Sequence, residues 1–102
     1  MRIRVRGIEQ DGQRALRGYA TRRLLIGLSR FRPTSVRLRF GSSDTHMLGP
    51  AVECFLVVEL NASQTIVARV VDRDRVSAFD RALERALRSA SRVLREPRGS
   101  TS

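Results

Sequence analysis

The most regular hydrophobic pattern in the chain runs from Asp74 to Arg95, near its C-terminus. At the roughly 100° per residue of an α-helix, its apolar residues fall on one side. They are Val76, Phe79, Leu83, Ala86, Leu87, Ala90, Val93 and Leu94. A row of arginines falls within a narrow arc on the opposite side, namely Arg81, Arg85, Arg88, Arg92 and Arg95. The pattern predicts an amphipathic helix that is capped by Asp74 and stopped by Pro97.

A second helix is predicted over residues 14–31. Its apolar stripe consists of Leu16, Ala20, Leu24, Gly27 and Phe31. Gly27 should cost this helix roughly 1 kcal/mol relative to alanine, a cost that a close approach of the sheet to the helix at that point could justify. The Arg32–Pro33 pair ends the helix, because proline cannot continue it.

Apolar and polar residues alternate in four other segments, which predicts strands over 2–8, 35–40, 51–60 and 64–71. The element order is β-α-β-β-β-α, which gives an α+β fold. We expect a four-stranded mixed sheet with two helices on one face, as in double-stranded-RNA-binding-like domains. Residues 1–96 should form a single domain, and residues 97–102 a flexible tail.

Charge narrows the choice of partner. The chain carries 20 basic residues, all of them arginine, against 10 acidic ones, for a net charge of +10. Such a field favours polyanions, with nucleic acid ahead of an anionic membrane surface. In the arginine row of the last helix, Glu84 is the one acid placed to pair with Arg81 or Arg88, so most of the repulsion stays uncompensated. We therefore favour phosphate binding over a merely solvated face.

Neither a membrane span nor a signal peptide is indicated, because no run of about 18 apolar residues exists. The single cysteine, Cys54, excludes an internal disulfide and fits a reducing compartment. We expect a cytoplasmic protein.

Catalytic and metal-binding patterns are missing from the sequence. His46 is the only histidine, and Cys54 is predicted to point into the core, so neither a triad nor a zinc site can be assembled. Asp72 and Asp74 lie beside arginines and are better suited to capping and turn chemistry. We predict no enzymatic activity, cofactor, metal or small-molecule substrate.

An apolar cluster is predicted on the sheet face that the helices leave uncovered. It consists of Phe55, Val57, Val67 and Val71. Exposed apolar patches on small domains often mark partner surfaces, although long arginine stems can also cover them. The cluster leads us to expect a weak homodimer, or a partner protein, on this face.

Several of these residues together resemble the short ribosome hibernation-promoting factors, a family related to ribosome-associated inhibitor A. The resemblance covers residues 1 to about 95 and lies in the order and spacing of the motifs. In the N-terminal half they are Gly7, Ala15-Leu16-Arg17-x-Tyr19, Arg23-Leu24 and Phe31. Asp72-x-Asp74, Ala78-Phe79-Asp80 and the basic helix follow.

The resemblance implies a cytoplasmic, non-enzymatic protein that binds the small ribosomal subunit where mRNA and tRNAs would sit. It also implies that basic helix residues face ribosomal RNA. By position these are Arg22, Arg23, Arg81, Arg85, Arg88, Arg92 and Arg95. Two alternatives stay open, namely a general structured-RNA-binding protein and a homodimeric interaction module of the same fold.

Overall fold

A computed structural model describes residues 1–7, 14–43, 51–61 and 63–95. The predicted tail at 97–102 and His46 lie outside the described residues. The elements are β1 (Arg2–Arg6), α1 (Arg14–Leu28), a 3-10 turn η1 (Ser29–Phe31), β2 (Ser35–Ser43), β3 (Ala51–Asn61), β4 (Gln64–Asp72) and α2 (Arg75–Arg95). All six predicted helices and strands are present, in the predicted order.

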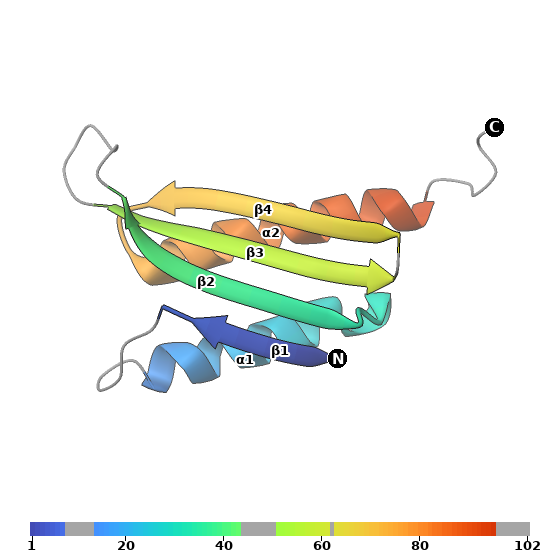
Figure 1. Cartoon of the computed structure of the whole chain (residues 1–102), viewed down its shortest axis with the longest axis horizontal. Coiled ribbons are helices and arrows are strands. Elements are labelled where there is room, and N and C mark those ends of the chain that lie inside the picture. Colours follow the sequence, from blue (N-terminus) through green and yellow to red (C-terminus); the bar gives the residue numbers. More distant parts are fainter. Residues whose placement is uncertain (8–13, 44–50, 62, 96–102) are drawn as a thin grey trace.

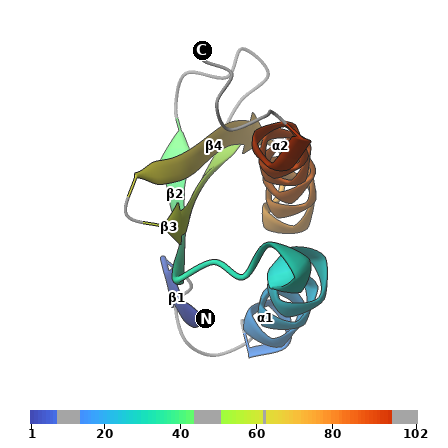
Figure 2. The same cartoon turned by 90° about the vertical axis from the view of Figure 1, so that its right-hand side faces the viewer.

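The sheet follows the order of the chain, β1-β2-β3-β4 (Figure 1). Strand β1 pairs with β2 in parallel, and the other two pairings are antiparallel. Both helices cover the same face of the sheet, with α1 over the β1 side and α2 over the β4 side (Figure 2). The predicted four-stranded α+β fold is therefore confirmed.

The core lies between this helix layer and the sheet. Alternate residues of the three long strands face it and are buried: Val36, Leu38, Phe40, Cys54, Leu56, Val58, Ile66, Ala68 and Val70. The helices add Ala20, Leu24 and Leu28 from α1, and Ala78, Phe79, Ala82, Leu83, Ala86 and Ala90 from α2. Arg2, Arg4 and Arg6 alternate with half-buried Ile3 and Val5, so β1 is an edge strand with a basic outer side.

The buried face of α2 differs from its predicted extent at both ends. Val76 and Leu94 are 45% and 62% exposed, whereas Ala78 and Ala82 are fully buried. The difference arises because the small alanine side chains let α2 lie close to the sheet along the arc that contains them. Val76 and Leu94 lie at the margin of that arc, in the first and last turns.

Gly27 faces the other helix, α2, rather than the sheet. A Cβ atom added there would lie 3.6 Å from Leu87 Cδ1 and 3.9 Å from Leu83 Cδ1. These are ordinary van der Waals distances, and the backbone of Gly27 is helical. The prediction of a sheet contact was therefore wrong, and space for a methyl group exists.

Gly27→Ala should raise the free energy of unfolding by about 0.5–1 kcal/mol, because alanine loses less backbone entropy and the added methyl group gains contact with Leu87. Gly18→Ala is the matched control, since its Cβ would meet only Arg22 Nη1, at 3.7 Å. Urea denaturation should show a gain for Gly27→Ala at least as large as that for Gly18→Ala. A loss of stability would contradict the packing described here.

Candidate nucleic-acid interface

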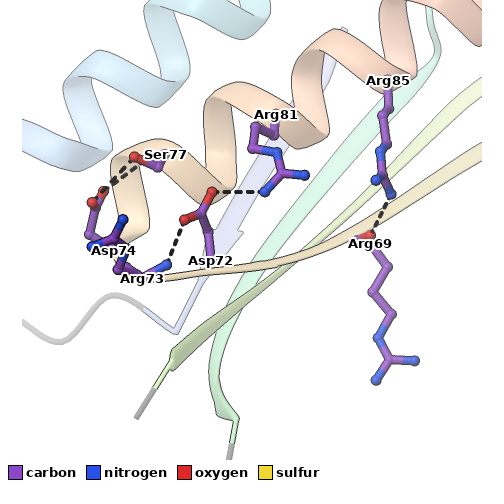
Figure 3. A network of polar contacts seen from close by, with 7 residues as sticks. All are labelled: Arg69, Asp72, Arg73, Asp74, Ser77, Arg81 and Arg85. Atoms are coloured by element: carbon purple, nitrogen blue, oxygen red, sulfur yellow. Dashed lines mark hydrogen bonds and ion pairs between the residues drawn. The ribbon is translucent and has the colours of Figure 1, made fainter. Parts of the chain in front are cut away.

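Helix α2 is fixed at its start by two carboxylates. Asp74 Oδ1 accepts the Ser77 N–H at 2.8 Å, and its Oδ2 accepts the Ser77 hydroxyl at 3.2 Å. Asp72 Oδ1 accepts the Arg73 N–H at 2.7 Å (Figure 3). Asp74 is thus the N-cap, as predicted, and both acids serve turn and capping chemistry.

Two arginines of the predicted row are tied to strand β4. Arg81 Nη1 lies 3.1 Å from Asp72 Oδ2, and Arg85 Nη1 donates to the backbone carbonyl of Arg69 at 3.2 Å (Figure 3). The bonds from the Arg73 N–H and Arg81 lower the pKa of Asp72 below its ordinary value. The Asp72 carboxylate therefore partly offsets the positive charge of Arg81, whereas the neutral Arg69 carbonyl leaves the positive charge of Arg85 without such an offset.

Arg88 and Arg92 are exposed on the outer side of α2. With Glu84, Leu87 and Ser91 they line a hollow of about 510 Å³. Arg88 makes no hydrogen bond or ion pair within the described parts of the chain, and Arg92 makes only a long 3.5 Å bond to Ser89 Oγ. Glu84, the acid expected to pair with Arg81 or Arg88, likewise has no ion-pair partner among the described residues. The two guanidinium groups are therefore available to bind an external anion.

Arg30 joins this site from η1, the 3-10 turn that follows α1, and was not predicted from the sequence. Its Nη2 donates to Ser91 Oγ at 3.1 Å, and its guanidinium carbon lies 4.6 Å from the centre of the Phe31 ring. Its spacing of seven residues from Arg23, two helical turns, was the available signal. Ser91, between Arg88 and Arg92, is where arginines of both helices meet.

The relative position of the two helices is set by Tyr19. Its hydroxyl donates to Asp80 Oδ1 at 2.7 Å, and its ring packs edge-on against Phe79 with centroids 6.0 Å apart. The hydrogen bond to Asp80 raises the pKa of Tyr19, and the nearby Arg23 opposes that shift. Arg22 and Arg23 are exposed on α1. The predicted RNA-binding arginines whose side chains the structure describes, together with Arg30, are called the helix-layer arginines below; they are Arg22, Arg23, Arg30, Arg81, Arg85, Arg88 and Arg92, and all are exposed.

Arg95 is the last residue of α2, and its side chain lies outside what the structure describes. Its predicted part in RNA binding stays a prediction.

The apolar cluster on the outer face of the sheet is smaller than predicted. Val67 is 57% exposed and Phe55 and Val71 are half-buried, but Val57 is only 7% exposed. Val57 pairs across the sheet with Arg37, and Phe55 pairs with Arg39, whose guanidinium carbon lies 5.2 Å from the Phe55 ring centre. Val57 therefore does not belong to an exposed patch, since arginine side chains dominate this side of the sheet.

Within the described residues, no group of three or more histidine, cysteine or carboxylate side chains is placed to hold a metal ion. Burial raises the pKa of the Cys54 thiol to about 12, so the thiolate is unfavourable. None of the described helices is long and apolar enough to cross a membrane.

Comparison with known proteins gives matches in structure but not in sequence. No family model matches, and no curated protein matches the sequence. The N-terminal domain of Protein Y from Thermus thermophilus superimposes with a TM-score of 0.71 at 18% identity, over 91% of this chain and 99% of that domain. A ribosomal subunit interface protein from Coxiella burnetii gives a TM-score of 0.70 at 19% identity, over 94% of this chain and 100% of that one. The chain has the fold of these two proteins.

Proposed function

We propose that this protein is a ribosome-associated translation inhibitor, which binds small-subunit ribosomal RNA through its helix-layer arginines. Bound there, it occludes the mRNA and tRNA sites and keeps the ribosome in an inactive, hibernating state. It acts in the cytoplasm by occupying space and has no enzymatic step. Sequence motifs that resemble the hibernation-promoting factors and the basic helix layer described above support this proposal.

The observation that carries the proposal is the fold shared with a ribosomal subunit interface protein over nearly the whole of both chains. The surface chemistry agrees with it. Guanidinium groups bind phosphate oxygens in a two-pronged geometry and stay charged at all physiological pH values. Arg30, Arg88 and Arg92 bring such groups from two helices to one place around Ser91. A ribosomal RNA surface offers the matching array of phosphates.

The alternatives are a general structured-RNA-binding protein and a homodimeric module. The first would use the same arginines on RNA that is free of the ribosome. The second would use the outer sheet face, where Val67 is the one strongly exposed apolar residue of the predicted cluster and arginines surround it. A two-fold axis there brings like charges together, so we expect any dimer to be weak and to strengthen with salt.

Arginine substitutions at the hollow test how the subunit is bound. Arg88→Ala with Arg92→Ala should weaken binding to small ribosomal subunits by about tenfold or more at moderate salt. It should also lower the magnitude of the log–log salt slope by about two, because each arginine neutralises about one phosphate. The measurement is co-sedimentation with purified small subunits over a series of salt concentrations.

The matched control is Arg14→Ala with Arg73→Ala, which removes two exposed arginines outside the helix-layer set. It changes the net charge by the same amount, so any general effect of charge appears in both double variants. Equal losses in the two would mean that the helix-layer arginines form no site. A flat salt response of the wild-type protein would contradict phosphate contacts altogether.

A further inference from the structure

The outer face of the sheet carries an unusual arrangement of like charges. Strands β1 and β2 run parallel, and their register places Arg4 opposite Arg37 and Arg6 opposite Arg39. Alternate residues of a strand point to the same side, so all four guanidinium groups lie on the face away from the helices. Like charges opposite one another weaken a sheet. These four residues, Arg4, Arg6, Arg37 and Arg39, are called the arginine square below, and their mutual repulsion destabilises the fold.

The acids of this face offset only part of that charge. Glu53 of β3 pairs with Arg69 of β4, away from β1 and β2. Glu59 lies 3.9 Å from Arg37 Nη2 and also accepts the Ser35 hydroxyl at 2.6 Å. Among the described residues, Arg4, Arg6 and Arg39 have no acidic partner. The square is thus a concentrated positive site on a surface that the proposed ribosome-binding helices do not use.

The square surrounds a pocket with an apolar wall. The pocket has a volume of about 300 Å³ and is lined by Arg4, Arg6, Arg37, Leu38, Arg39, Phe55 and Val57. That volume is at the lower end of small-ligand pockets, which suits one nucleotide. Phe55 is half-buried beneath the Arg39 guanidinium, so both an aromatic ring and a planar cation are present for stacking.

We propose that this pocket binds single-stranded RNA, with one base stacked at Phe55 and Arg39 and the flanking phosphates held by the arginine square. Sequence-independent binding of single strands combines these two features, a basic groove and an aromatic platform. Arg2, Arg4 and Arg6 occupy alternate positions of β1 and so recur about every 6.6 Å. That repeat is close to the separation of successive phosphates in an extended strand. A regular duplex keeps its bases stacked inside and offers none to the pocket.

The proposal goes beyond ribosome binding through the helices, because the two surfaces lie on opposite sides of the molecule (Figure 2). With both occupied, the protein holds a single-stranded segment on its sheet while its helix layer contacts structured RNA. Each surface is tested by its own set of variants, so the failure of one proposal is separable from the failure of the other.

The test is fluorescence anisotropy of a labelled octa-uridylate, titrated with the 102-residue protein. Arg4→Ala with Arg39→Ala should weaken binding by about tenfold or more and lower the salt slope by about two. Arg14→Ala with Arg73→Ala, and Arg88→Ala with Arg92→Ala, should each change it far less. Phe55→Leu should weaken oligonucleotide binding several-fold but leave the binding of inorganic polyphosphate unchanged, because polyphosphate has no base to stack.

Folding and ribosome binding are the internal controls for the Arg4, Arg39 double variant. It should remain folded, with a melting temperature within about 4–8 °C of the wild type, since relief of the like-charge pairs offsets the lost contact of Arg39 with Phe55. It should still co-sediment with small subunits. An equal loss with Arg14→Ala and Arg73→Ala would overturn the proposal in favour of diffuse charge attraction. An unchanged RNA affinity in Phe55→Leu would reduce the pocket to a phosphate site. A Phe55-dependent dimer that excludes the oligonucleotide would show that a second copy of the chain occupies the face.

Discussion

Leu83→Ala is expected to lower the free energy of unfolding by about 2–5 kcal/mol, a large part of the 5–15 kcal/mol that stabilises a typical domain. Leu83 is 1% exposed and packs in the core between α2 and the sheet. Truncation there loses the transfer free energy of the buried methyl groups and leaves a cavity. The surrounding strands can fill that cavity only in part, because both layers are built of regular elements that move as units. Urea denaturation monitored by circular dichroism measures the loss.

Leu94→Ala is the matched control, because it makes the same chemical change on the same helix. Leu94 is 62% exposed, so the substitution should change stability by no more than about 0.5 kcal/mol. Similar losses for the two variants would mean that the assignment of the buried face of α2 is wrong.

Gly7→Ala is expected to destabilise the protein by about 2–5 kcal/mol, although Gly7 is exposed and lies at the end of a short strand. Its φ angle is +82°, in the left-handed region that costs a residue with a Cβ atom about 1–2 kcal/mol. The added Cβ would also lie 2.9 Å from the Phe40 backbone nitrogen and would overlap the Phe40 carbonyl oxygen. Since the obstacle is the backbone of β2, relief requires the end of β1 to move, at a further cost of about 1–3 kcal/mol.

Gly41→Ala is the control for this prediction. Gly41 follows Phe40 on β2, and a Cβ atom there would meet nothing within 4 Å. Its substitution should leave the melting temperature unchanged or slightly raised. In a domain of this size, about 1 kcal/mol corresponds to roughly 4–8 °C in melting temperature. A melting temperature of Gly7→Ala within about 2–3 °C of the wild type would therefore contradict the close contact between Gly7 and the Phe40 backbone.

Much of the fold follows from periodicity in the sequence. The alternation of Val36, Leu38 and Phe40 with Arg37 and Arg39 is enough to assign the inner side of β2, and all three apolar residues are buried. The 3.6-residue pattern of α2 identifies the middle of its buried face, at Phe79, Leu83, Ala86 and Ala90, but not its two ends, where Val76 and Leu94 are exposed. Both assignments rest on hydrophobicity, because the apolar face of a strand or helix must pack against the apolar core.

Features that depend on exact distances between elements were not predictable. Nothing in the sequence told whether the sheet or α2 approaches Gly27, since that depends on how closely two helices pack. The strand alternation places Val57 on the outer face and predicts it to be exposed, yet it is buried between its cross-strand neighbours, Arg37 on β2 and Val67 on β4. The spacing of helix residues correctly predicted that the described arginines of the α2 row face solvent. It could not predict that Arg81 and Arg85 bond to residues of β4, or that Arg30 bonds to Ser91.

We propose that the helix layer binds the small ribosomal subunit where mRNA and tRNA bind. The most direct measurement is co-sedimentation of the wild-type protein with purified small subunits, alone and after loading with mRNA and initiator tRNA. We predict stoichiometric binding to empty subunits and loss of binding to loaded ones. Free fragments of ribosomal RNA should bind more weakly, because they lack the assembled site. Equal binding to loaded and empty subunits would contradict occlusion, and binding to free RNA without binding to subunits would contradict a ribosomal function.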